Sequence, residues 1–113
     1  MTNVIATQGK LAQYYGTLAT YCGLATGNPG TNATPANEAS GGSYARVPVG
    51  TWTLSGNTIT ASAVLINAPI GTYTYGILAS AATGATMVDN AAITSTPLNA
   101  PGQIVITPSF SVS

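Results

Sequence analysis

From Tyr44 to the C-terminus, short runs of β-branched, aromatic and small residues alternate with turn-forming Gly, Pro and Asn about every 8 to 12 residues. Runs of this length and composition favour strands over helices. The pattern predicts a mainly β protein, an antiparallel β-sandwich or barrel of about six to eight strands with a short N-terminal helix. The expected strands cover 19–25, 44–54, 58–66, 72–80, 85–94 and 103–112.

The positions of the prolines and the alternation of side chains predict further details of these strands. Pro48 and Gly50 interrupt 44–54, which is therefore expected to be an edge or bulged strand. Pro97 is expected to end the strand that starts at 85. The side chains expected to share a face are Ile59 with Ala61, Ala63 and Leu65, and Tyr73 with Tyr75, Ile77 and Ala79.

The N-terminal segment has a different pattern. Residues 1–6 are expected to form an extended arm. Thr7 can then cap a short helix that ends near Leu18, since Leu11 and Tyr14 continue a helical spacing. With 113 residues, the chain fits a single domain.

A long polar stretch separates the first expected strand from the rest. Residues 27–43, GNPGTNATPANEASGGS, contain two prolines and four glycines. A loop of this length in a compact domain is usually functional or a contact surface. Within it, Asn32-Ala33-Thr34 matches a glycosylation acceptor, but the secretory context is missing, so no modification is expected.

Charged side chains are scarce. The chain has two basic and two acidic residues, 4% in all, against about 25% in a typical soluble domain. Two cations cannot supply the counterion release that drives nucleic-acid binding. The apolar runs are far shorter than the roughly 20 residues of a spanning helix, so no membrane insertion is expected. A neutral surface of Thr, Ser, Asn and Gly favours contacts between copies, so we expect a homo-oligomer that works inside an assembly.

Few residues could support catalysis. The chain lacks histidine, the usual general base and metal ligand. Cys22 is alone, and we expect a buried packing residue rather than a reactive thiol. Glu38 and Asp89 are the only acids and thus the one available pair for glycoside hydrolysis, but no sequence feature brings them together. Asp89 is instead expected with Asn90 at a turn or strand end. We expect no enzymatic activity, no catalytic residues, no cofactor and no metal site.

Glu38 and Arg46 flank the turn-forming pair Gly41-Gly42. One hypothesis is that they form an ion pair that pins the long loop to the strand that follows. Another is that both side chains are solvated, in which case the pair contributes about 0 to 1 kcal/mol. A third is that they contact a neighbouring subunit.

The aromatic residues leave two hypotheses open. Six tyrosines and one tryptophan could stack on sugars, as in a carbohydrate-binding module. The exposed platform would then come from Tyr73, Tyr75 or Trp52. The competing hypothesis is that these side chains pack in the core or at interfaces.

One motif resembles a known family. An Asn-Pro-Gly turn followed by Asn37-Glu38-Ala39-Ser40-Gly41-Gly42-Ser43-Tyr44-Ala45-Arg46 resembles small tailed-bacteriophage virion proteins, in which a DPG turn leads into NE-x-SGG-x-YAR. Further matching pieces are Gly71-Thr72, Gly76-Ile77-Leu78, Ala82-Thr83-Gly84 and the C-terminal strand 102–112. The similarity covers residues 18–113; the chain departs from the family at Asn28, which replaces an Asp, and in the long loop before Glu38.

The resemblance implies a non-enzymatic, β-rich structural component of the virion, made in the host cytoplasm. Family members are commonly described as minor tail or tail-fibre proteins, and some resemble capsid decoration proteins. The favoured hypothesis is a decoration protein that binds the major capsid lattice and stabilises the head, with a trimer suited to three-fold positions. The alternatives are a minor tail or tail-fibre protein that contacts the host surface, and the carbohydrate-binding module.

Overall fold

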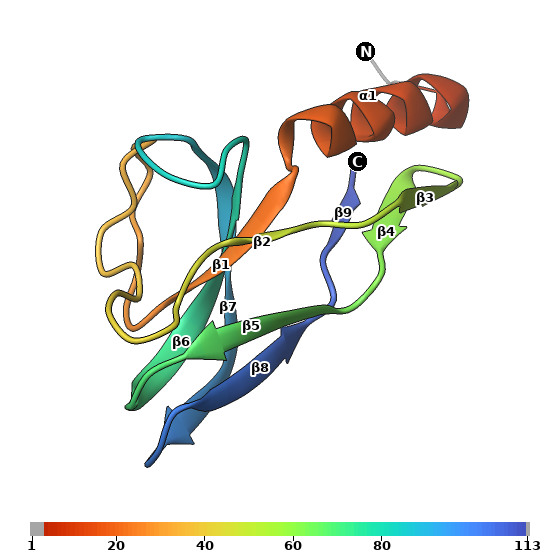
Figure 1. The fold of residues 1–113 in the computed structure, drawn as a ribbon. Helices are drawn as coiled ribbons and strands as arrows, with labels where there is room; N and C mark the ends of the chain where they lie inside the picture. The colour runs from red at the N-terminus through yellow and green to blue at the C-terminus, as the bar shows by residue number, and fades with distance from the viewer. Residues whose placement is uncertain (1–3, 113) are drawn as a thin grey trace.

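A computed structural model describes residues 4–112, which form one helix and nine strands in three antiparallel sheets (Figure 1). The predicted class, a mainly β fold with a short N-terminal helix, is confirmed. The elements are α1 (Ile5–Leu18), β1 (Tyr21–Ala25), β2 (Val47–Pro48), β3 (Trp52–Ser55), β4 (Thr58–Ala61), β5 (Val64–Ala68), β6 (Gly71–Ala79), β7 (Met87–Leu98), β8 (Gly102–Ile106) and β9 (Ser109–Ser111).

The sheets differ in size and place. A four-stranded sheet has the order β2-β1-β6-β7, a three-stranded sheet the order β3-β4-β9, and β5 pairs with β8 alone. Only two residues separate β4 from β5, and two separate β8 from β9, so these four strands form one long ribbon. The ribbon bends where the Ala61 N–H donates to the Pro108 carbonyl at 2.9 Å. One half crosses the four-stranded sheet and the other extends toward α1 (Figure 1).

The main core lies between the four-stranded sheet and the β5–β8 pair, so the molecule is sandwich-like. Tyr73 is the largest fully buried side chain, and its hydroxyl donates to the Pro69 carbonyl at 2.7 Å. The buried members of this cluster are Cys22, Leu24, Ala39, Val64, Ile66, Ala68, Tyr73 and Ile104.

A second apolar contact joins α1 to the three-stranded sheet, with Ala12 and Ile59 buried between them. Glycine inside a helix costs about 1 kcal/mol relative to Ala, but here it permits close approach. A Cβ on Gly9 would lie 2.7 Å from the Gly56 carbonyl oxygen, and one on Gly16 would lie 3.1 Å from the Trp52 ring.

The start of the helix corrects two predictions. The helix begins at Ile5 with Val4 as N-cap and no side-chain cap, so Thr7 lies inside the first turns. Of the predicted arm 1–6, residues 1–3 lie outside the described residues, and 5–6 are helical. The Gln8 N–H bonds the Val4 carbonyl at 3.0 Å. A helix that starts at Ile5 gains one turn of backbone hydrogen bonds. These bonds outweigh the predicted side-chain cap at Thr7, which would contribute about 1 kcal/mol.

Three predicted strands each divide between sheets. The stretch 44–54 becomes β2 in the four-stranded sheet and β3 in the three-stranded sheet. The stretch 58–66 becomes β4 and β5, and 103–112 becomes β8 and β9. At the bend, the buried side chains change from odd-numbered positions in β4 to even-numbered positions in β5. A shift of one residue exchanges the two faces of a strand. Ile59 and Ala61 are buried as predicted, whereas Leu65 is 53% exposed and Ile66 fully buried.

Two predictions concern proline. The prediction that 44–54 is an edge or bulged strand is confirmed in part, because β2 is an edge strand that contains Pro48 but covers only two residues of the stretch. The prediction that Pro97 ends its strand is wrong, since β7 continues through Leu98. β7 pairs only with β6, and an edge strand tolerates the missing N–H of proline.

The predicted shared face of 72–80 is confirmed in part. Tyr73, Ile77 and Ala79 are buried, but Tyr75 is only half-buried, and the β6–β7 register shifts between Tyr73 and Tyr75. Across 4–112, no helix has the length and apolar character needed to span a bilayer.

Candidate functional site

The long loop leaves β1 and returns to it at Glu38. Asn37 adopts φ 60, a left-handed conformation that Asn tolerates better than most residues. The returning chain pairs with β1, because the Thr26 N–H bonds the Asn37 carbonyl and the Ala39 N–H bonds the Leu24 carbonyl, both at 3.0 Å. Glu38 is thereby placed beside Ala25 at the end of β1.

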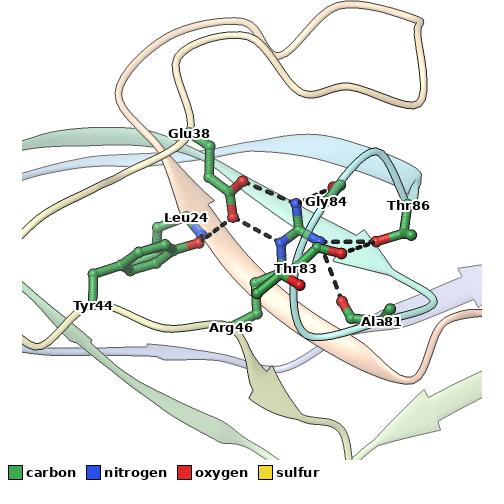
Figure 2. Close-up of polar contacts among 8 residues, drawn as sticks. All are labelled: Leu24, Glu38, Tyr44, Arg46, Ala81, Thr83, Gly84 and Thr86. Carbon is green, nitrogen blue, oxygen red and sulfur yellow. Dashed lines mark hydrogen bonds and ion pairs between the residues drawn. The ribbon is translucent and has the colours of Figure 1, made fainter.

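Arg46 is buried and forms a bidentate ion pair with Glu38 (Figure 2). Its Nε donates to Glu38 Oε2 at 2.8 Å, and Nη2 donates to Oε1 at 2.9 Å. Nη1 donates to the Ala81 carbonyl at 3.1 Å and to Thr86 Oγ1 at 2.9 Å. Nη2 also donates to the Gly84 carbonyl at 3.1 Å. All five guanidinium N–H groups therefore have an acceptor.

Tyr44 completes this cluster (Figure 2). Its hydroxyl donates to Glu38 Oε2 at 2.7 Å and accepts from the Leu24 N–H at 3.2 Å. A Cβ on Gly23 of β1 would approach the Tyr44 oxygen to 2.5 Å, so any larger residue there would displace the Tyr44 hydroxyl. We call Glu38, Tyr44 and Arg46 the Glu–Tyr–Arg node.

The node keeps both its charges. Burial opposes ionisation of Glu38, but hydrogen bonds from Arg46 and Tyr44 outweigh it and hold the pKa of that carboxyl below its usual value. The hydrogen bond to Glu38 raises the pKa of Arg46 despite burial. Burial, together with the bond donated to Glu38, raises the pKa of Tyr44. At neutral pH the node is thus a carboxylate held by a guanidinium and a phenol.

Two more bonds tie the long loop to β7. The Met87 N–H donates to the Ala33 carbonyl at 2.9 Å. Asn90 Nδ2 donates to the Gly30 carbonyl at 3.0 Å. Together with Arg46, which reaches the turn that precedes β7, these bonds fix the loop against the four-stranded sheet.

The three hypotheses for the charged pair now separate. The side chains of Arg46 and Glu38 are 3% and 21% exposed, so the solvated pair is wrong. The pinning hypothesis is confirmed, and it extends further than predicted, because Arg46 also holds the turn 81–86. The third hypothesis, a contact of the pair with a neighbouring subunit, stays a prediction.

The structure does not bring the two acids together. Asp89 lies within β7, not at a turn or strand end as predicted, because β7 already begins at Met87. Its Oδ2 accepts from the Tyr15 hydroxyl at 2.7 Å, and its Oδ1 accepts from the Asn90 N–H at 2.8 Å. Asp89 lines a cavity whose walls do not include Glu38.

Three aromatic side chains, Tyr15, Trp52 and Phe110, pack against one another. Tyr73 is 1% exposed and offers no platform to a sugar, while Tyr75 and Trp52 are half-buried. The Trp52 indole N–H donates to the Ala19 carbonyl at 3.1 Å. Tyr15 stacks on Phe110 with ring centres 3.7 Å apart and meets Trp52 edge-on at 6.3 Å. The contacts of Tyr15 were not predicted, because their partners are distant in sequence.

Cys22 is a packing residue, as predicted. Its side chain is 1% exposed within the main core. Burial raises the pKa of the thiol to about 12, so it is neutral at physiological pH.

Comparison of the chain with protein-family models, with curated proteins and with solved structures found no match in any of the three. The family suggested by the NE-x-SGG-x-YAR motif therefore stays a prediction, and the function is argued from the residues themselves.

Proposed function

We propose that this protein is a non-enzymatic structural component of a tailed-bacteriophage virion, and that it decorates the capsid by binding the major capsid lattice. The observation that carries the proposal is the Glu–Tyr–Arg node. The ionisable residues of the motif, Glu38, Tyr44 and Arg46, are all engaged in holding the long loop. A motif used in this way encodes a rigid surface rather than a reactive centre.

The charge distribution supports this role. Glu38 and Arg46 neutralise each other inside the fold, which leaves Lys10 and Asp89 as the remaining charged side chains. The exterior is therefore nearly uncharged, and repulsion between copies is small. Low repulsion between copies favours dense packing of one protein on a regular lattice.

Exposed apolar side chains support contacts with other subunits. Leu65 and Val105 face each other across β5 and β8, and they are 53% and 58% exposed. A second group lies on or beside α1. Its exposed members are Val4, Ile5, Leu11, Tyr14 and Leu18. The proposal assigns these surfaces to a homo-oligomer, such as a trimer, and to the capsid protein.

The experiment is stoichiometry in purified particles. Quantitative mass spectrometry would compare peptides of this protein with peptides of the major capsid protein from the same digest. A decoration protein is expected at a ratio between about one to three and one to one, set by the lattice symmetry. A ratio far below this would place the protein in the tail, and absence from washed particles would overturn the virion role.

A further inference from the structure

A cavity of about 280 Å³ lies where α1, the β6–β7 pair and the β8–β9 connection meet. It is distinct from the Glu–Tyr–Arg node, none of whose residues lines it. Apolar walls come from Ile93, Ile106 and Ala92, and polar groups come from Asp89, Thr107 and Ser109.

The cavity carries one negative charge. Three of its lining residues can ionise, namely Asp89, Tyr15 and Cys22. The thiol is neutral, since burial raises the pKa of Cys22 to about 12. Burial and the neighbouring carboxylate raise the pKa of Tyr15, so the phenol stays protonated and donates to Asp89. The carboxylate of Asp89 is therefore the only charge on the cavity wall.

No cation of the described chain neutralises this carboxylate. Within residues 4–112, the ion pair of Arg46 with Glu38 is the only one. Lys10 is exposed on α1 and does not line the cavity. Each oxygen of Asp89 accepts one hydrogen bond, whereas a carboxylate has about four acceptor positions. Acceptor capacity thus remains for an incoming donor.

We propose that this cavity binds the side chain of a lysine or arginine from a partner protein. The methylene groups would lie against Ile93 and Ile106, and the charged end would bond Asp89. The volume is just below the roughly 300–1,000 Å³ of sites for drug-sized ligands, which suits one long side chain better than a whole metabolite.

The position of the cavity favours a protein partner over a free amine. It adjoins β7, the last strand of the four-stranded sheet, whose start contacts the long loop through Met87 and Asn90 and whose Ala91 and Ala92 follow that contact. The residues of β7 that line the cavity include Ala91 and Ala92, which are exposed. An open strand edge offers backbone donors and acceptors to an extended peptide. A basic residue of a peptide bound along Ala91 and Ala92 would lie at the mouth of the cavity that Asp89 lines.

The test uses three capped pentapeptides, Thr-Val-X-Val-Thr, in which X is lysine, arginine or norleucine. Each is titrated into the intact protein, and binding is followed by NMR of the Ile93 and Ile106 methyl groups. The lysine and arginine peptides are expected to bind at least about fivefold more tightly than the norleucine peptide. Equal binding of all three, or no shift at the highest soluble concentration, would overturn the proposal. n-Butylammonium that binds as tightly as the lysine peptide would overturn the assignment to a protein partner.

The variant that isolates the charge is Asp89→Asn, which keeps an oxygen to accept from Tyr15. It is expected to abolish the preference for the basic peptides. Thr53→Lys adds the same increment of net charge at an exposed position away from the cavity, and it is expected to change nothing. Loss of preference in both variants would contradict a local role for Asp89. If Asp89→Asn does not fold, the comparison of peptides on the unaltered protein decides alone. These titrations can fail while the particle stoichiometry holds, so the two proposals stand separately.

Discussion

Removal of either partner of the Glu–Tyr–Arg node should destabilise the fold far more than loss of a surface ion pair. Glu38→Ala leaves the Arg46 guanidinium, whose side chain is 3% exposed, without its counter-charge. Two of its five N–H groups also lose their acceptors. Arg46→Ala instead leaves Glu38 with only the Tyr44 donor and frees three acceptors in the 81–86 turn.

The expected magnitudes follow from burial. Breaking a buried ion pair by removing one partner costs about 3–5 kcal/mol, against about 0–1 kcal/mol for an exposed pair. The double variant removes both charges, so it should cost at least about 2 kcal/mol less than the sum of the two single variants. Arg46→Lys keeps the charge but offers three donors in place of five, and should cost about 1–3 kcal/mol.

The assay is urea unfolding followed by the fluorescence of Trp52, with free energies compared in a double-mutant cycle. Lys10→Ala removes an exposed charge and serves as the control, with an expected change within about 0.5 kcal/mol. Single variants that each cost under about 1 kcal/mol would refute the reasoning. So would single effects that simply add, because the pair would then act as two solvated side chains.

Three other measurements probe the same structure. The pKa of Glu38 is lowered in the fold, so the contribution of its carboxylate to the free energy of unfolding should be complete above the unfolded pKa of about 4.3 and should fade as pH falls further. The free energies of unfolding of the protein and of Glu38→Gln should therefore converge at low pH. A difference that stays constant with pH would contradict this. Gly9→Ala should destabilise by about 1–3 kcal/mol in thermal melts despite its better helix propensity, because its Cβ would lie 2.7 Å from a carbonyl oxygen, whereas Lys10→Ala at an exposed position of the helix should be neutral. Cys22 should react with a thiol reagent only when urea unfolds the chain, and rapid labelling of the native protein would be inconsistent with its burial.

Local features of the chain were predictable from the sequence. Turn-forming residues placed most strand ends, and the helix ends at Leu18 as its spacing indicated. Glu38 and Arg46 are eight positions apart, and the glycine pair between them made an ion pair a reasonable hypothesis. In each case the residues that decide the structure lie within one short segment.

Features that depend on distant partners were not predictable. Nothing within 58–66 indicates that its two halves join different sheets, because the bend is held by the bond from Ala61 to Pro108. Tyr15 and Asp89 are 74 positions apart, and no local pattern connects them. The reach of Arg46 to the 81–86 turn is equally non-local, so the sequence could suggest the ion pair but not the full set of five bonds.

The placement of four charged side chains connects the fold to the proposed assembly. Two of them neutralise each other in the node, where they hold the long loop without adding charge to the surface. The surface that remains is polar and apolar, so the proposed contacts between copies should depend little on salt. Among residues 4–112, Asp89 then stands out as a carboxylate with hydrogen-bond donors but no ion-pair partner, in a cavity with apolar walls. Neutral surfaces can bind a partner in several orientations. In a chain with so few charges, the carboxylate of Asp89 alone can select one of these orientations.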